Sequence, residues 1–200
     1  MRALIMAGGA GSRLSLGEKP LILINGQPMI AYVIGAFQQA GCEPIIAVSP
    51  KTPMTADWCR ARDLAVCRTG GVGFIEDMVQ AIGTLEEEKP LFISVSDIPC
   101  ITGDIVRSIA GAYGTAGTDA LSTWVPASRV KSCRGGMPYR EQVHGIEACP
   151  AGINILRGDC ADEIQEEFFL LMDEPCLALN VNDRAGLKEA EIYLQNIKTR

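Results

Sequence analysis

The chain has 200 residues, a formal net charge of −6 at pH 7 and 48% hydrophobic residues. A chain of this length suits a single domain that buries roughly 70% of its unfolded surface, so its core needs no cross-links. The negative charge argues against nucleic acids and anionic membranes as partners, because both are negatively charged themselves. No stretch of about 20 apolar residues is present, so we expect no membrane span.

The chain has eight cysteines, at positions 42, 59, 67, 100, 133, 149, 160 and 176. No two are spaced as Cys-x-x-Cys and His144 is the single histidine, so a tetrahedral zinc site has no support in the sequence. The first apolar run is too short for a secretory signal and ends in glycines. We therefore interpret the cysteines as reduced, mostly buried thiols of a cytoplasmic protein.

The N-terminal segment combines an apolar strand pattern with a glycine-rich loop. Ala3 to Ala7 is apolar, Gly8-Gly9-Ala10-Gly11-Ser12-Arg13 follows, and Glu18-Lys19-Pro20 comes shortly after. Glycines let successive backbone amides approach one anion, and Arg13 and Lys19 add positive charge. The pattern predicts a binding site for a triphosphate.

Two well-known phosphate motifs do not match this loop. The dinucleotide motif requires a third glycine where Leu14 stands, and the Walker motif requires Gly-Lys-Ser/Thr where the chain has Arg13-Leu14-Ser15. A glycine-rich turn with two solvated cations is the plain alternative. The complete pattern resembles the signature loop of nucleotidyltransferases, which join a nucleoside monophosphate from an NTP to an acceptor phosphate and release pyrophosphate.

The next segments alternate between strand and helix patterns. Thr52 or Thr55 is a candidate cap for the second of the helices. The strand pattern at 44–49 has no alternation, as expected where both faces of a parallel sheet are covered. The order predicts a doubly wound α/β sheet. We expect an extended piece at 21–24, a turn at Asn25-Gly26, a helix from Pro28 to Gly41, strands at 44–49 and 64–67, and a helix at 52–62.

A second glycine loop, 69–73, precedes a helical pattern that begins at Phe74. We expect the backbone amides of Gly71 and Gly73 to lie near the base or ribose of a nucleotide. The alternative for Glu76 and Asp77 is that acidic residues in a first helical turn simply interact with the helix dipole.

The strand pattern at 91–96 delivers Asp97 at its carboxyl end, where ligands bind in open α/β sheets. Pro99 disfavours a helical conformation at Ile98, which keeps the carboxylate on a turn. Mg²⁺ takes one or two carboxylates together with phosphates and water, so Asp97 is our predicted magnesium ligand. A strand-end aspartate can also cap a helix, but Thr102 or Asp104 could do that here.

The rest of the chain contains one long polar segment among regular patterns. We expect a helix at 105–113, strands at 120–125 and 150–156, and a last helix with Asp183 as its N-cap. The polar segment at 126–148 has little periodicity, and a long irregular segment in a compact domain is usually functional or mobile. We assign it to the acceptor side of the site, although a solvated surface loop explains it about equally well.

With these segments in place, the chain resembles the small nucleotidyltransferases that include molybdenum-cofactor guanylyltransferase, and more narrowly the archaeal type of adenosylcobinamide-phosphate guanylyltransferase. The matching segments run from the first strand to the last helix. They are Glu18-Lys19-Pro20-Leu21-Ile22, Ser49-Pro50-Lys51-Thr52-Pro53, Gly73-Phe74-Ile75-Glu76-Asp77, Val95-Ser96-Asp97 and Pro150-Ala151-Gly152-Ile153-Asn154.

The resemblance implies a single-domain, Rossmann-like αβα sandwich with a mostly parallel sheet, of the nucleotide-diphospho-sugar transferase type. It implies transfer of GMP from GTP to the phosphate of adenosylcobinamide phosphate, giving adenosylcobinamide-GDP and pyrophosphate in cobalamin synthesis. It also implies Mg²⁺, and it leaves a homodimer open. The acceptor phosphate is already ionised, so no strong general base is needed, and His144 is expected to be structural.

The resemblance also implies the site residues. Arg13, Lys19 and Asp97 would be catalytic, and Gly152 and Asn154 would lie on the acceptor side. Asn182 is a second candidate magnesium ligand beside Asp97, with its neighbours Asn180 and Asp183 left open as alternatives. The implied nucleotide-binding residues are Leu4, Ala7, Gly8, Gly9, Ala10, Gly11, Ser12, Arg13, Lys19, Ser49, Gly71, Gly73, Glu76 and Asp97.

Two other functions stay open. Within enzymes, the acceptor could be molybdopterin or a sugar phosphate. Outside enzymes, the chain could be a regulatory domain that binds GTP without turnover, although such a domain does not need a metal-binding carboxylate.

Overall fold

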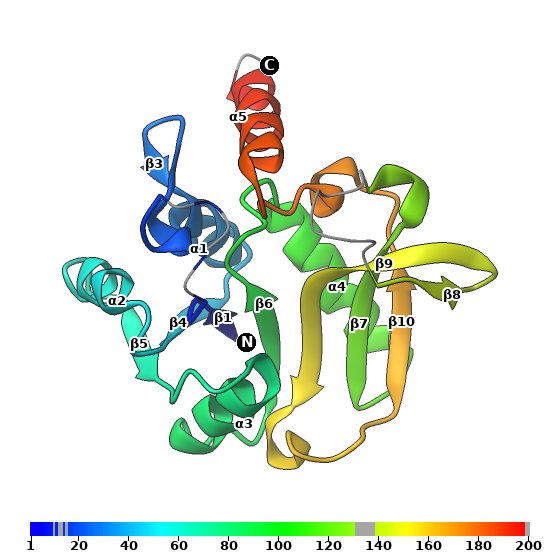
Figure 1. Ribbon diagram of the computed structural model, residues 1–200. Helices are drawn as coiled ribbons and strands as arrows, with labels where there is room; N and C mark the ends of the chain where they lie inside the picture. The colour runs from blue at the N-terminus through cyan, green and yellow to red at the C-terminus, as the bar shows by residue number, and fades with distance from the viewer. Residues whose placement is uncertain (10, 12–13, 15, 131–138, 199–200) are drawn as a thin grey trace.

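A computed structural model describes residues 1–9, 11, 14, 16–130 and 139–198 (Figure 1). Within this part of the chain, eight strands form one sheet in the spatial order β10-β7-β9-β6-β1-β4-β5, with β8 paired to β9 alone. The strands are β1 (Arg2–Met6), β4 (Glu43–Val48), β5 (Ala65–Arg68), β6 (Pro90–Val95), β7 (Ala120–Pro126), β8 (Glu141–Val143), β9 (Ile146–Arg157) and β10 (Glu167–Leu171).

The sheet is mostly parallel. β1 pairs in parallel with β4 and β6, β4 with β5, and β7 with β10. β9 is inserted between β6 and β7 and runs antiparallel to both. A separate hairpin of β2 (Leu23–Ile24) and β3 (Gln27–Pro28) turns at Asn25-Gly26, where both residues have positive φ. This is the turn that the Asn-Gly pair predicts.

Helices cover both faces of the sheet. Residues of α1, α2, α4 and α5 contribute to the larger apolar core on one face, whereas α3 packs over β1, β4 and β6 in a smaller core. This arrangement is the three-layer αβα sandwich that the sequence predicts. The helices are α1 (Met29–Gln39), α2 (Pro53–Arg60), α3 (Phe74–Thr84), α4 (Gly103–Ala116) and α5 (Arg184–Lys198); the short 3₁₀ helices are η1 (Lys19–Leu21), η2 (Ala127–Arg129), η3 (Gly158–Cys160) and η4 (Pro175–Ala178).

The ends of several helices confirm the sequence signals. Thr102 caps α4 through its hydroxyl, which accepts from the Ile105 amide, and Gly117 ends the helix in the left-handed conformation. Asp183 Oδ1 accepts from the Gly186 amide at 2.9 Å, as expected for the N-cap of α5. Figure 1 shows α5 standing out from the body of the molecule, with the C-terminus at its tip.

The cap of α2 differs from the prediction. Neither Thr52 nor Thr55 caps this helix with its side chain. The Glu18 carboxylate does so instead, accepting from the amides of Met54 at 2.7 Å and Thr55 at 2.6 Å. The Thr52 hydroxyl instead accepts a hydrogen bond from the backbone amide of Ser49. The sequence could not show this contact because Glu18 lies more than thirty positions before the helix.

Two irregular segments are also more ordered than expected. The piece at 21–24 begins as η1 before it becomes β2, because Pro20 favours a tight turn. The segment at 126–148 was expected to be irregular throughout, and this is wrong at its end. Glu141–Val143 and the start of β9 form an antiparallel hairpin that turns at His144-Gly145, both with positive φ. Residues 131–138 lie outside the described part.

The sheet brings the predicted ligand-binding segments to one edge. β1, β4, β5 and β6 are parallel, so Gly8, Ser49, Gly70 and Asp97 all follow the carboxyl ends of neighbouring strands. Open α/β sheets bind ligands at this edge. None of the helices in the described part is long and apolar enough to span a bilayer.

Candidate active site

Three polar side chains from distant segments meet at this edge. Lys19 Nζ donates to Asp97 Oδ2 in a short ion pair and to Asn182 Oδ1 at 2.8 Å. The Lys19 and Asp97 side chains are 15% and 16% exposed. Removing two charges from water is costly, so their contact with each other offsets much of that cost. The other oxygen, Asp97 Oδ1, is buried and has no hydrogen-bond partner among the described residues.

Backbone contacts fix the positions of these three residues. Glu18, the residue before Lys19, accepts hydrogen bonds from backbone amides at the N-terminus of α2. The Val181 amide donates to the Asp97 carbonyl at 2.9 Å, which holds Asn182 close to the end of β6. These contacts tie the segments that carry Lys19 and Asn182 to the N-terminus of α2 and to the end of β6.

The first glycine loop packs closely against the rest of the site. A Cβ on Gly8 would lie 3.1 Å from Ser49 Cβ, and Ser49 Oγ donates to the Gly8 carbonyl at 2.7 Å. Gly11 has φ +61°, and a Cβ there would overlap the Lys19 side chain. Glycine is required at Gly11 for both reasons. Ala10, Ser12 and Arg13 lie outside the described residues.

The second glycine loop is held by α3. The Gly71 and Val72 amides donate to Asp77 Oδ1 at 2.8 and 3.3 Å, and Lys51 Nζ donates to the Gly71 carbonyl at 2.7 Å. The sequence predicts that the Gly71 amide lies near a nucleotide. In this structure the Gly71 amide already donates its hydrogen bond to Asp77. Gly71 nevertheless lines the cavity described next.

A cavity of about 300 Å³ lies between the two glycine loops. Lys19, Lys51 and the N-terminus of α3 offer groups that can bind phosphate oxygens, while the two carboxylates of the lining are already engaged, Asp97 by Lys19 and Asp77 by amides of the loop. Its lining consists of Met6, Gly8, Gly9, Lys19, Lys51, Gly71, Val72, Gly73, Phe74, Asp77, Val95, Ser96 and Asp97.

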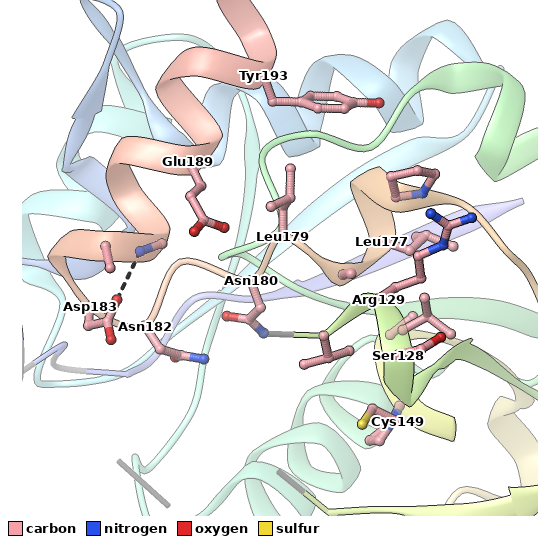
Figure 2. Close-up of a pocket in the computed structure, with 18 of the residues that line it drawn as sticks. Ser128, Arg129, Cys149, Leu177, Leu179, Asn180, Asn182, Asp183, Glu189 and Tyr193 are labelled. Atoms are coloured by element: carbon pink, nitrogen blue, oxygen red, sulfur yellow. Dashed lines mark hydrogen bonds between the residues drawn. The ribbon is translucent and has the colours of Figure 1, made fainter. Parts of the chain in front are cut away.

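A larger cavity of about 710 Å³ lies on the other side of Asn182. Figure 2 shows Glu189 and Tyr193 of α5 on one wall and Ser128 and Arg129 of η2 on the opposite wall, with Leu179 and Asn180 between them. Arg129 is paired with Asp173 through two hydrogen bonds of 2.6 and 3.0 Å. Apolar side chains supply much of the remaining wall, namely Val125, Val130, Leu177 and Ile192.

Buried titratable groups near the larger cavity remain neutral. Burial, and then the neighbouring Cys176 thiol, raise the pKa of Tyr193 to about 12. Burial also raises the pKa of the Cys149 thiol, which lines the cavity. Neither group is ionised near pH 7, so neither provides a thiolate or phenolate nucleophile.

The two cavities meet at the Lys19 contact. Lys19 and Asp97 line the smaller cavity, Asn182 lines the larger one, and the bond from Lys19 to Asn182 joins them. Ligands in the two cavities would therefore lie on either side of the hydrogen bond from Lys19 to Asn182. This arrangement suits the transfer of a group from one ligand to the other.

The oxygens at this junction fit a hard divalent cation. Asp97 Oδ1 is a buried carboxylate oxygen without a hydrogen-bond partner in the described part, and Asn182 contributes an amide oxygen beside it. The described residues contain no group of three or more histidine, cysteine, aspartate or glutamate side chains that could hold a metal ion. A cation here would thus need phosphate oxygens and water to complete its coordination, which is usual for Mg²⁺.

The other predicted site residues lie at varying distances from the cavities. Ala7 is buried beside the first glycine loop, whereas Leu4 lies in the apolar core below it. Glu76 is exposed, and its carboxylate folds back over Gly73. Asn154 lies inside the sheet, paired with Ser122 and Ile93.

Gly152 packs against Val95. Its φ is +79°, and a Cβ would lie 2.7 Å from Val95 Cγ2. Val95 lines the smaller cavity, and the neighbouring Ala151 lines the larger one. A side chain at Gly152 would therefore push on Val95 in the wall of the smaller cavity.

Sequence reasoning missed several residues of the site. Lys51 was noticed only as part of a matching segment, and its position after a strand end could have indicated a ligand-facing cation. Asn180 was considered only as a neighbour of Asn182, and Leu179 and Tyr193 come from segments without a recognisable motif. No local signal could have placed them in one cavity, because η2, η4 and α5 meet there only in three dimensions.

Comparisons with known proteins agree with this geometry. Residues 3–179 match the family model described as the MobA-like NTP transferase domain. The chain is 31% identical to the adenosylcobinamide-phosphate guanylyltransferase of Methanocaldococcus jannaschii, over 98% of both chains. It is 27% identical to the molybdenum cofactor guanylyltransferase of Shewanella putrefaciens, over 58% of this chain and 59% of that protein.

A solved structure shares the fold. The structure of CMP:2-keto-3-deoxy-manno-octonic acid synthetase complexed with CTP superimposes with a TM-score of 0.70 at 17% identity, over 98% of both chains. This likeness confirms the predicted nucleotide-diphospho-sugar transferase type of fold. The family match and the full-length relative together show that the chain belongs to the MobA-like NTP transferase family.

Proposed function

We propose that this protein is a guanylyltransferase that moves GMP from GTP to the phosphate of adenosylcobinamide phosphate. The observation that carries the proposal is the junction of two cavities at Lys19, Asp97 and Asn182. The full-length similarity to an adenosylcobinamide-phosphate guanylyltransferase supports this choice of donor and acceptor. One sheet runs through the chain from β1 to β10, which supports a single domain over residues 1–200.

In this proposal GTP occupies the smaller cavity. Lys19, and Arg13 from the same segment, would neutralise charge on its phosphates. The glycine loop from Gly8 to Ser12 would bind the triphosphate through backbone amides, and the Gly71–Gly73 loop would lie along the base or ribose. Leu4, Ala7, Ser49 and Glu76 belong to the same proposed nucleotide site. The two lysines and the glycine backbone in the lining of this cavity support the assignment, although the chain as a whole is acidic.

The acceptor occupies the larger cavity. Its volume lies in the range usual for small-molecule sites, and its apolar walls suit a bulky acceptor with a phosphate at one end. Gly152 and Asn154 are proposed to shape this side, and the segment at 126–148 contributes Ser128 and Arg129 to the wall.

The reaction needs little acid–base chemistry. An ionised oxygen of the acceptor phosphate attacks the α-phosphorus of GTP, and the bond from that phosphorus to the bridging oxygen breaks. The bridging oxygen leaves with the β- and γ-phosphates as pyrophosphate, so no proton has to be removed. Lys19 stabilises the negative charge that develops during transfer, and it is held in place for this by Asn182.

Mg²⁺ is the proposed cofactor. Asp97 would be its protein ligand through Oδ1, with the Asn182 amide oxygen as the second candidate. When bound, the ion supplies further neutralisation of phosphate charge. Lys19 is bonded to Asp97 Oδ2, so Oδ1 can take the ion while that pair stays in place. The Asn182 oxygen would become a ligand only if Lys19 releases it, and the phosphates of GTP offer the ammonium group a new partner.

The setting of the enzyme is part of the proposal. The seven cysteines of the described part are free thiols, which supports a reducing, cytoplasmic location. The acidic net charge supports the absence of nucleic acid and anionic membrane from its partners. We keep a homodimer as the alternative to a monomer, and gel filtration with light scattering measures this directly.

The test is product analysis. Purified protein with GTP, MgCl₂ and adenosylcobinamide phosphate should form adenosylcobinamide-GDP and pyrophosphate in equal amounts, and omission of the acceptor should stop both. The Asp97→Asn variant should be inactive with the fold retained. Product with molybdopterin or a sugar phosphate in place of the corrinoid would favour those acceptors. Bound GTP without any pyrophosphate release would indicate a regulatory domain.

A further inference from the structure

Asp77 is a buried carboxylate that the reaction itself does not use. It lies in the first turns of α3 and is 7% exposed, whereas its neighbour Glu76 is exposed. A carboxylate that only interacts with a helix dipole can stay in water, as Glu76 does. Burial of Asp77 costs free energy unless hydrogen bonds compensate it, so its partners indicate its role.

Those partners are consecutive backbone amides of the second glycine loop. Asp77 Oδ1 accepts from Gly71 at 2.8 Å and from Val72 at 3.3 Å. One turn further along α3, Gln80 Oε1 accepts from the Gly70 amide at 2.8 Å. Three successive backbone amides of the loop thus donate hydrogen bonds to side chains of the helix that follows it.

The same loop is held from the opposite side. Lys51 Nζ donates to the Gly71 carbonyl at 2.7 Å, and the Lys51 amide donates to Ser49 Oγ at 3.1 Å. Ser49 Oγ in turn donates to the Gly8 carbonyl of the first glycine loop. Gly71 has φ +73°, and a Cβ there would lie 3.0 Å from Ser49 Cβ. The loop is therefore held between Asp77 of α3 on one side and Ser49 and Lys51 on the other.

We propose that Asp77 is a positioning residue that sets the shape of the 70–72 loop before a nucleotide arrives, and so determines how tightly the protein binds GTP. The inference rests on the proposed function for the identity of the nucleotide, and the contacts themselves are independent of it. Asp77 acts through the loop and not on the reacting phosphorus. Its loss weakens nucleotide binding and leaves the turnover of bound substrate largely intact.

The experiment compares Asp77→Ala and Asp77→Asn with the wild-type protein. Asparagine keeps an oxygen that can accept from both amides, whereas alanine removes it. Asp77→Ala should raise the Kd for GDP and the KM for GTP about tenfold or more, and change kcat less than about threefold. Asp77→Asn should restore most of the affinity. Hydrogen exchange of the Gly70, Gly71 and Val72 amides, measured without ligand, should be faster in Asp77→Ala and close to wild type in Asp77→Asn.

Asp104→Ala is the matched control, because Asp104 is also an aspartate in a first helical turn but is exposed and lines neither cavity. It should change none of these quantities. Should Asp77→Ala fail to fold, Gln80→Ala replaces it, since this exposed side chain holds the Gly70 amide. That variant should speed exchange at Gly70 and weaken GDP binding to a smaller degree.

Two results would overturn the proposal. One is that a folded Asp77→Ala protein, or Gln80→Ala if that variant replaces it, shows unchanged hydrogen exchange of the loop amides and an unchanged affinity for GDP. The other is an Asp77→Asn variant that binds GDP as poorly as Asp77→Ala, because the negative charge itself would then be required. A wild-type protein that binds GDP and protects the loop but transfers no GMP would refute the proposed function and leave this inference standing.

Discussion

Replacement of Lys19 by methionine separates its structural role from its chemical one. Methionine is similar in length but carries no charge and donates no hydrogen bond. The variant leaves the Asp97 carboxylate without its cation, and this side chain is 16% exposed. Breaking a fully buried ion pair costs about 3–5 kcal/mol. Since both partners line a cavity that admits water, we expect a loss of about 2 kcal/mol in the free energy of unfolding.

The double variant Lys19→Met with Asp97→Asn tests this interpretation. It removes the unpaired charge, so its free energy of unfolding should return to within about 1 kcal/mol of wild type. Its activity should not return, because both the phosphate-binding cation and the metal ligand are gone. We expect kcat to fall about 100-fold or more in the single variant and at least as far in the double variant.

Urea denaturation gives the stabilities, and pyrophosphate release with GTP and acceptor gives the rates. A single variant as stable as wild type would mean that the Lys19 and Asp97 side chains do not pair in solution. A single variant with wild-type kcat would remove Lys19 from the mechanism. Either result refutes the corresponding half of the reasoning, and neither result depends on the other.

Three further predictions concern two supports of the site and the buried cysteines of the core. Gly11→Ala forces a positive φ on alanine and a clash with Lys19, so it should cost about 1–3 kcal/mol in denaturation and lower kcat/KM for GTP. Glu18→Ala removes the cap of α2 and should lower stability by about 1–2 kcal/mol, with reduced kcat from a less fixed Lys19; unchanged melting would show that the cap is not formed. Burial raises the pKa of Cys59 to about 11 and of Cys100 to about 12, from 9.0 for an ordinary thiol. The folded chain therefore holds more protons than the unfolded chain above pH 9, and stability should be full below pH 9 and fall as pH rises toward 12. Cys59→Ala should make this fall shallower, and a Tm that is flat from pH 9 to 11 would contradict it.

The central geometry of the site could be predicted from the sequence. Lys19 and Asp97 are 78 positions apart, yet both were placed in one site, and the structure brings them into contact. Two rules made this possible: an apolar run followed by glycines marks a strand that enters a ligand loop, and parallel strands end at one edge of a sheet. The layers of the fold followed from the same alternation of strand and helix patterns.

The features that were missed depend on contacts between distant segments, or on sequence patterns too short to recognise. Glu18 caps α2, and nothing in the local sequence of that helix indicates it. The hairpin at 141–157 turns on His144-Gly145, a pair that can adopt positive φ much as Asn-Gly does, but its first strand has only three residues. Asp77 stands off the apolar face of α3 in the helical pattern, and it is buried because the loop before it needs a hydrogen-bond acceptor.

The larger cavity shows the limit of local patterns most clearly. Its walls include residues of η2, η4 and α5, and η2 lies tens of residues before the other two and shares no periodicity with them. Burial at each position depends on which segment packs against it, and a local sequence pattern does not reveal that segment. The identity of the acceptor is therefore harder to infer than the position of the nucleotide.

The most direct test of the account is a structure of the protein with Mg²⁺ and a GTP analogue that cannot be cleaved between its α- and β-phosphates. We expect the triphosphate in the smaller cavity, the metal ion on Asp97 Oδ1, and Lys19 Nζ within hydrogen-bond distance of a phosphate oxygen. A nucleotide in the larger cavity, or an Asp97 carboxylate still paired to Lys19 with the ion bound elsewhere, would contradict it.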